Sequence, residues 1–261
     1  MSDRWSVAGG QWRLSCIMLL LFTCVPIAAE DAERIMRESD RRQQVKSQTY
    51  DGQLEVTDPG GKVFKKSWRM FREGSGSASK VLVRFSAPPE VDGVGLLILA
   101  RSNAPDDQWM YTPAIRRDRR ISMQDRSARF MGTDFSYEDM EQRDIDEYAY
   151  ELLGEEIREG QPCWKIRARA KNPGQSQYSW SDIRVRKDNY LVIFVEMYIK
   201  ETLRKVLELT DVAQIQSVWT AQLLRMKDLQ RGGSTVMRLQ NTRYGESFPA
   251  DFFSLRTLRS Q

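Results

Sequence analysis

Residues 191–199 read LVIFVEMYI, and this stretch decides the fold class. Every second position is apolar, which gives one row of Leu191, Ile193, Val195, Met197 and Ile199. The opposite row mixes apolar and charged side chains, namely Val192, Phe194 and Tyr198 with Glu196 and Lys200. Because successive side chains of a β-strand point to opposite faces of a sheet, this period of two predicts a strand.

The same alternation recurs along most of the chain. Residues 163–170 (CWKIRARA) and 81–85 (VLVRF) repeat it, and turn-forming clusters such as residues 58–61 (DPGG) separate the runs. We count about ten or eleven strand candidates between residues 46 and 244. Their hairpin-length spacing predicts an antiparallel sheet, and the chain lacks the strand–helix alternation of a doubly wound fold.

Three short segments carry helical signals instead. Residues 31–43 predict a helix, because acidic residues at its start and basic residues at its end match the helix dipole. One helical turn is predicted near residues 136–141, where Ser136 precedes Asp139 at capping-box spacing. A second is predicted near residues 249–253, where a proline suits the first helical position.

Residues 1–29 have the features of a secretory signal peptide. Basic residues precede a short apolar run from Cys16 to Ala29, and an acidic segment follows. The run is shorter than the roughly 20 residues that span a bilayer. We therefore predict cleavage after Ala29 and a single domain over residues 30–261. The alternatives are a retained N-terminal anchor and a lipoprotein acylated at Cys24.

The amino-acid composition excludes several classes of protein function. The chain has no histidine, which excludes Ser-His-Asp and Cys-His catalysis and histidine-containing metal sites. Cys163 is the only cysteine after residue 29, so the processed chain has no intrachain disulfide. A net charge of +4 does not indicate a polyanion binder. We expect no cofactor, no metal site and no nucleic-acid partner.

Residues 134–159 are strongly acidic, with Arg143 and Arg158 as their only basic residues. This segment follows the basic residues 116–129, so the two either pair with each other or present a charged docking surface. A carboxylate-dependent hydrolase stays open as an alternative, because spacing alone does not identify paired catalytic carboxylates.

Several strand candidates are apolar on both faces. Residues 94–100 read VGLLILA, and Phe64, Trp68 and Met70 share one face of a strand over residues 62–72. A sheet with one wet face alternates cleanly, so strands that are apolar on both faces need a second cover. A lipid in an apolar cavity and an ordinary packed core both provide such a cover, and the residues leave both open.

Residues 109–139 carry a longer pattern, WMYTPAIRRDRRISMQDRSARFMGTDFSYED. It combines an aromatic strand W-x-Y-x-P, a basic pair before an isoleucine and an F-x-G-x-D-F-x-Y-E-D block, and residues 251–255 (DFFSL) follow near the C-terminus. On these motifs the chain resembles the bacterial outer-membrane lipoprotein-sorting family. That family is related to the periplasmic lipoprotein carriers LolA and LolB.

The resemblance implies a mainly β fold with a single strongly curved antiparallel sheet. This sheet would form an unclosed half-barrel with an N-terminal helix and short capping helices. The implied function is a periplasmic, non-enzymatic carrier that binds lipid or lipoprotein acyl chains in an apolar cavity for outer-membrane sorting. The implied partners are a membrane surface, contacted transiently, and an inner-membrane exporter of the RND or MMPL type. The alternative is a periplasmic sensor or accessory module for such an exporter, or for an envelope stress system, on the same fold.

Two sets of residues are candidates for these contacts. The candidate lining of the lipid cavity consists of Trp68, Met70, Leu97, Leu99, Trp109, Tyr111, Phe130 and Phe135. A basic strip is the candidate for docking a lipid headgroup or a partner, because arginine pairs bidentately with phosphate and carboxylate. It consists of Arg116, Arg117, Arg119 and Arg120. The alternatives are a plain sheet core for the first set and a solvated hairpin face for the second.

Overall fold

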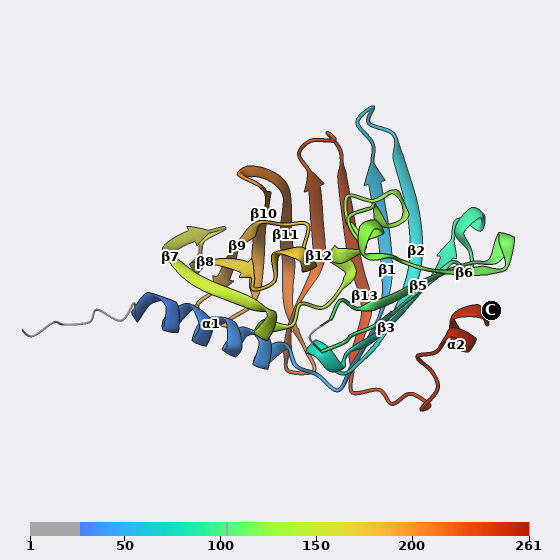
Figure 1. The fold of residues 1–261 in the computed structure, drawn as a ribbon, viewed down its shortest axis with the longest axis horizontal. Helices are drawn as coiled ribbons and strands as arrows, with labels where there is room; N and C mark the ends of the chain where they lie inside the picture. Colours follow the sequence, from blue (N-terminus) through green and yellow to red (C-terminus); the bar gives the residue numbers. More distant parts are fainter. Residues whose placement is uncertain (1–26, 103, 261) are drawn as a thin grey trace, which may run out of the picture.

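The computed structural model describes residues 27–102 and 104–260, so most of the predicted signal peptide lies outside the described residues. One antiparallel sheet of thirteen strands dominates it, in the order β6-β5-β4-β3-β2-β1-β13-β12-β11-β10-β9-β8-β7 (Figure 1). The strands are β1 (Ser47–Thr57), β2 (Val63–Glu73), β3 (Lys80–Ala87), β4 (Gly95–Leu99), β5 (Asp107–Thr112), β6 (Arg117–Arg120), β7 (Tyr148–Arg158), β8 (Gln161–Ala170), β9 (Trp180–Arg186), β10 (Val192–Ile199), β11 (Thr202–Ile215), β12 (Val218–Asp228) and β13 (Ser234–Tyr244). The helices are α1 (Ile27–Gln43) and α2 (Leu255–Arg259).

The order of the strands forces one long crossing. The chain runs outward from β1, in the middle of the sheet, to the edge strand β6. It resumes at the opposite edge strand, β7, and returns strand by strand to β13, which pairs with β1. Residues 121–147, which we call the crossing segment, therefore traverse the whole width of the sheet, in front of its concave face (Figure 1).

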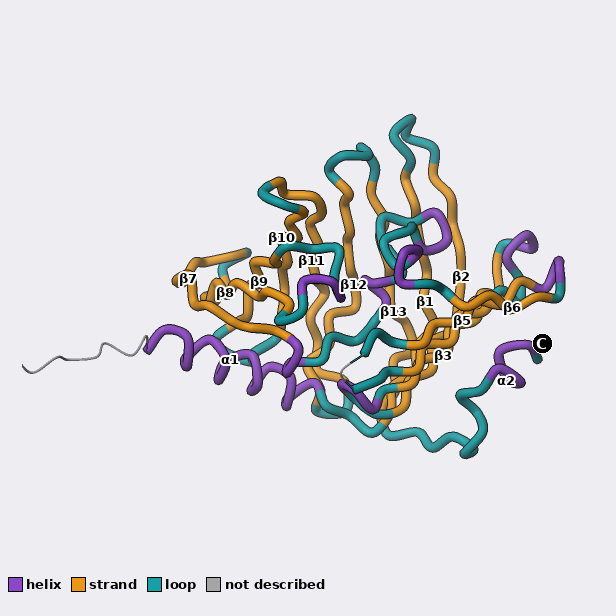
Figure 2. The backbone as a smooth tube through the Cα atoms, viewed as in Figure 1, coloured by secondary structure: helices purple, strands orange, loops and turns teal. Residues whose placement is uncertain are grey.

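The concave face carries the main core. Ala32, Ile35 and Met36 of α1 are buried in the same cluster as Phe130 of the crossing segment. Figure 2 shows α1 lying across the β7 end of the sheet, where it contacts β7 and β12. None of the helices among the described residues is both long and apolar enough to cross a membrane.

The predicted fold class is confirmed. The sheet is single, antiparallel and unclosed, because its edge strands β6 and β7 pair only with β5 and β8. It has thirteen strands instead of the expected ten or eleven. One strand that hydrophobic alternation does not reveal is β6, whose sequence is RDRR. It forms because its backbone pairs with β5, which shows that pairing rather than side-chain burial defines this edge.

A β-bulge divides the apolar row that residues 191–199 predict. The register between β10 and β9 shifts after Val192. Val195 joins the main core, whereas Ile193 packs beside the buried free Cys163 in a separate cluster. The predicted strand is confirmed. The prediction that its apolar row lies on a single face is wrong, because the extra residue of a bulge interrupts the alternation.

The C-terminal segment covers part of the opposite, convex face. A second cluster of buried side chains joins β3, β4 and β5 to Phe253 and Leu258. A single turn closes at residues 249–252, where the Phe252 N–H donates to the Pro249 carbonyl at 2.9 Å. Helix α2 follows it and is capped by Ser254, which accepts a hydrogen bond from the N–H of Thr257. Phe252 and Phe253 meet edge to face, with their ring centroids 5.1 Å apart. The segment therefore closes the convex side of the β2–β5 half of the sheet.

On the concave face, a close approach of β1 to the indole ring of Trp68 positions the core residues near β1 and β2. Gly52 of β1 pairs with Trp68 of β2, and a Cβ atom at residue 52 would lie 1.2 Å from Trp68 Nε1. Only glycine leaves room for the indole to lie flat over the strand. Trp68 then contacts Phe85 and Phe130, with ring centroids 5.3 and 5.9 Å away.

Candidate functional site

A cavity of about 360 Å³ lies between the concave face and the crossing segment. This volume lies near the lower end of the range of about 300–1,000 Å³ that is typical of small-molecule sites. Met36 of α1 and Phe135 of the crossing segment contribute to its apolar lining. The rest of the apolar wall comes from strands β8 to β12, namely Ala168, Ala170, Ile183, Val192, Val195, Met197, Leu207 and Met226.

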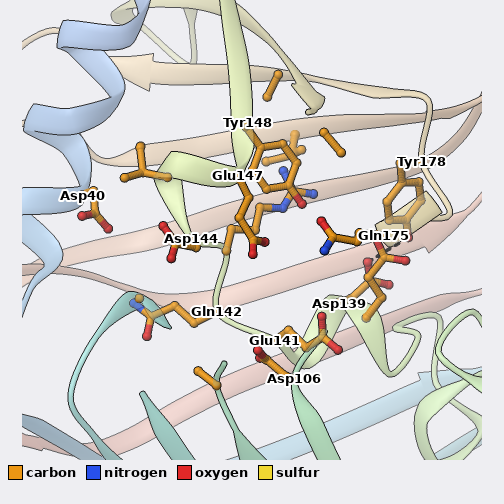
Figure 3. A pocket seen from close by; sticks show the side chains of 18 of the residues that line it. Asp40, Asp106, Asp139, Glu141, Gln142, Asp144, Glu147, Tyr148, Gln175 and Tyr178 are labelled. Atoms are coloured by element: carbon orange, nitrogen blue, oxygen red, sulfur yellow. Dashed lines mark hydrogen bonds between the residues drawn. The ribbon is translucent and has the colours of Figure 1, made fainter. Parts of the chain in front are cut away.

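The opposite side of the cavity is polar. Figure 3 shows carboxylates around it that come from α1, from the loop before β5 and from the crossing segment: Asp40, Asp106, Asp139, Glu141, Asp144 and Glu147. Three arginines, Arg101, Arg126 and Arg143, also belong to the lining. The cavity is therefore amphipathic, with an apolar wall on the sheet and a charged rim on the loops.

Asp139 anchors the crossing segment to the sheet. Its Oδ2 accepts hydrogen bonds from the backbone N–H and the hydroxyl of Ser136, at 2.7 and 2.8 Å. The ammonium of Lys205 on β11 lies 2.7 Å from the same oxygen, and the Tyr178 hydroxyl donates to Oδ1 at 2.8 Å. Burial, and then the charge of Asp139, raise the pKa of Tyr178, so the phenol stays protonated and donates. These contacts indicate that Asp139 has a structural role.

Two further acids of the rim are also engaged. Glu138 accepts hydrogen bonds from the Ser176 hydroxyl at 2.5 Å and from the Gln177 N–H at 3.0 Å. Glu141 forms an almost buried ion pair with Arg126, whose Nε lies 2.8 Å from Glu141 Oε1. Such fully bonded carboxylates hold the loop in place and are not free to bind a ligand.

Asp106 and Glu147 are different. One carboxylate oxygen of Asp106 is buried without a hydrogen-bond partner, and the other accepts a long bond of 3.3 Å from the Arg101 N–H. Burial, with a smaller contribution from Glu141, raises the pKa of Asp106 to about 7. Burial also raises the pKa of Glu147, with Asp144 adding to the effect. The rim is therefore less negative at Asp106 near neutral pH than its sequence indicates.

The eight predicted lining residues lie on two faces of the sheet. Trp68, Met70 and Phe130 are buried in the main core, and Phe135 lines the cavity. The other four belong to the cluster under the C-terminal segment, on the convex face: Leu97, Leu99, Trp109 and Tyr111. The structure thus brings one of the eight to the cavity, and lipid contact by any of them stays a prediction.

The predicted basic strip lies at the β5–β6 hairpin, on the edge of the sheet. Arg119 lies 3.2 Å from Asp125, and Arg120 pairs with Asp107. Arg116 and Arg117 are exposed, and within residues 27–102 and 104–260 neither has an ion-pair partner. Arg116 adopts the left-handed conformation at the hairpin turn, with a φ of 51°. The strip therefore divides into a paired half and an unpaired half.

Sequence reasoning missed the polar residues that shape the cavity. Tyr148 and Tyr150 of β7 line it, as do Tyr178 and Arg143. The signal for the first two was available, because both tyrosines fall on one face of an alternating strand. For Tyr178 and Arg143 no sequence signal exists, since the fold alone brings these loop residues over strands β8 to β12.

Three solved structures share this architecture. A domain from Vibrio parahaemolyticus, provisionally named an outer membrane lipoprotein-sorting protein, is 25% identical over 89% of this chain and 100% of its own, with a TM-score of 0.84. A DUF1329 family protein from Desulfovibrio piger is 28% identical over 88% of this chain and 99% of its own, with a TM-score of 0.85. A LolA superfamily protein from Nitrosomonas europaea has a TM-score of 0.71 at 16% identity, over 87% and 98% of the two chains.

The chain therefore shares the fold of a lipoprotein-sorting protein domain and of a LolA superfamily protein, as the motifs at residues 109–139 predict. A family model described as an uncharacterized protein matches residues 77–260, and the chain belongs to that family. The search of curated proteins returned no match.

Proposed function

We propose that this chain is a periplasmic carrier that binds lipid or lipoprotein acyl chains in the cavity for outer-membrane sorting, without a catalytic step. The observation that carries the proposal is the apolar wall on the concave face, which is continuous over β8 to β12. The periplasmic location rests on the signal features of residues 1–29. An exporter of the RND or MMPL type as the source of cargo rests on the family resemblance.

The energetics support a cavity of this kind. Each buried methylene contributes about 0.8 kcal/mol, so a chain of roughly 16 carbons resists transfer from membrane to water by on the order of 12 kcal/mol. A carrier offsets this by supplying apolar surface. The wall offers branched and thioether side chains, and its two methionines, Met197 and Met226, adapt to chains of different length because their side chains are flexible.

The direct test is lipid analysis of the purified protein. Organic extraction followed by mass spectrometry is expected to recover a lipid with at least one long acyl chain. Extracts without lipid, together with stable protein partners in a pull-down and no transfer between vesicles, would favour the sensor or accessory module instead.

Leu207→Asp is expected to reduce binding of a fluorescent acyl probe by at least about tenfold. A carboxylate beside the chain costs more than the about 1.4 kcal/mol that this factor represents. Leu207 is half-buried and lines the cavity, so its replacement leaves the rest of the core packed. Titration of the probe followed by fluorescence measures the effect.

Val212→Asp is the matched control. Val212 lies on the same strand and is also half-buried, but it packs against the cluster around Cys163 and not against the cavity. The control is expected to bind the probe like the parent chain. Equal loss of binding in both variants would contradict a role for the cavity.

We also propose that the β5–β6 hairpin makes the transient membrane contact, by docking on an anionic phospholipid surface. Arg116 and Arg117 supply unpaired positive charge, and Ile115 at the same turn is 64% exposed. Exposed basic and apolar side chains at one tip match the two components of an anionic lipid surface.

Arg116→Gln/Arg117→Gln is expected to weaken binding to vesicles that contain phosphatidylglycerol by about 30-fold. Each arginine near such a surface contributes about 1 kcal/mol. The control, Arg119→Gln/Arg120→Gln, removes the same charge from arginines already paired with carboxylates, so the loss should be smaller. Co-sedimentation with vesicles measures both, and equal losses would assign the binding to net charge alone.

A further inference from the structure

Among the described residues that line the cavity, one arginine has no carboxylate partner. Arg101 lies 3.4 Å from Asp107, and Arg126 is paired with Glu141. For Arg143 the described part of the chain offers no carboxylate within ion-pair distance. The cavity therefore contains one guanidinium whose charge-assisted hydrogen bonds are still available.

The position of Arg143 is fixed at the boundary between the rim and the wall. Its Nη2 donates to the Ser181 hydroxyl at 3.4 Å, and its Cζ lies 5.6 Å from the centre of the Tyr148 ring. Ser181 precedes the lining residue Ile183 by two positions on β9, so both side chains share the concave face. Arg143 lines the cavity, and the residue as a whole is exposed to solvent.

None of the neighbouring acids among the described residues forms an ion pair with this guanidinium, although the charges of Asp139 and Glu138 help to raise its pKa. Asp139 is satisfied by Lys205, and Glu138 by backbone and hydroxyl donors of the loop before β9. Burial raises the pKa of Asp106 to about 7, which reduces its negative charge near neutral pH. Asp144 accepts from the N–H of its own turn, and Asp40 accepts from the Gln44 amide. The N–H groups of Arg143 are thus not occupied by any of these carboxylates, and they can donate to a ligand.

We propose that Arg143 binds the anionic oxygen atoms of a head group, so that the cargo of the cavity is an acyl chain with a carboxylate or phosphate close to it. This inference rests on the proposed carrier function and names the substrate class of the same site.

The geometry gives the cargo one orientation. A guanidinium presents two parallel N–H groups, which match the two oxygens of a carboxylate or phosphate. With the head group at Arg143, the chain extends along Ile183, Val195 and Leu207 on successive strands of the wall. A cavity near the lower end of the usual volume range favours one chain over several.

The test compares ligands with the same chain and different head groups. Palmitate, hexadecyl phosphate and methyl palmitate, each below its aggregation concentration, displace a fluorescent acyl probe from the full processed chain. The acid and the phosphate are expected to bind about 10- to 100-fold more tightly than the ester, as the usual strength of a hydrogen bond to a charged group requires. The ratio of the affinities for palmitate and hexadecyl phosphate distinguishes the two head groups.

Arg143→Gln is expected to abolish the preference for the charged ligands over the ester. Arg169→Gln is the matched control, because Arg169 lies on β8 outside the lining of the cavity and pairs with Glu151, and it should keep the preference. Circular dichroism checks the fold of each variant. If Arg143→Gln does not fold, the comparison of acid and ester in the parent chain decides the question.

The outcomes separate the two proposals. Equal affinity for acid and ester in the parent chain, or an unchanged preference in Arg143→Gln, overturns the role of Arg143 and leaves the carrier function standing. A parent chain that binds none of the three ligands overturns the carrier function itself.

Discussion

Replacing Asp139 by alanine is expected to lower the free energy of unfolding by about 3–5 kcal/mol. The variant leaves the ammonium of Lys205, which is 5% exposed, without a counter-charge in the core. It also removes the acceptor of the Tyr178 hydroxyl and of the Ser136 N–H. Urea denaturation of the processed chain, followed by tryptophan fluorescence, measures the loss.

The control is Asp125→Ala. Asp125 also lies close to an arginine, Arg119, but both side chains are exposed, so the expected loss is below about 1 kcal/mol. The double variant Asp139→Leu/Lys205→Met tests the electrostatic reason. It removes both charges, so no unpaired ion remains, and the part of the loss that comes from the unpaired ammonium should be recovered. A loss in Asp139→Ala no larger than in Asp125→Ala would contradict the structural role of the pair.

Asp139 shows which contacts can be predicted from local sequence patterns and which cannot. The spacing of Ser136 and Asp139 predicts a capping box, and the turn at residues 138–140 with its reciprocal hydrogen bonds confirms it. The partner on β11 could not be predicted, because Lys205 is 66 residues away and only the return of the sheet places it under the crossing segment. Local patterns specify caps and strands, whereas topology specifies which elements meet.

Because local patterns do not specify which elements meet, they also do not predict on which face of the sheet the candidate lining residues lie. Residues 94–100 are apolar on both faces, as predicted, because Leu96 and Ile98 face the main core while Leu97 and Leu99 face the C-terminal segment. Alternation separates the two rows but does not say which row is concave. The second cover of this strand is therefore protein, supplied by the aromatic residues that follow β13.

The cavity itself follows from the same topology. It forms where the crossing segment passes β8 to β12, on the half of the sheet away from Trp68. On the other half, Phe130 packs beside Trp68 and Phe85, with ring centroids 5.9 Å away in each case. The crossing segment thus closes one half of the concave face with aromatic side chains and leaves space over the other.

Phe130→Ala is expected to lower the free energy of unfolding by about 3–5 kcal/mol. The ring is 1% exposed and contacts Trp68, Phe85 and Tyr137, so its removal leaves a hole among three aromatic rings that cannot all move to fill it. Phe130 was a candidate for contact with lipid, and the variant separates that role from packing. Urea denaturation and titration of the acyl probe are measured on the same preparation.

Phe130→Leu is the control for packing, since it keeps most of the buried volume and should lose clearly less stability than alanine does. Well below the denaturation midpoint, Phe130→Ala should still bind the acyl probe with an affinity close to that of the parent chain, because the ring does not line the cavity. The opposite result, full stability with lost binding, would mean that the acyl chain reaches Phe130. The tail would then extend past the wall of β8 to β12 into the aromatic half of the sheet.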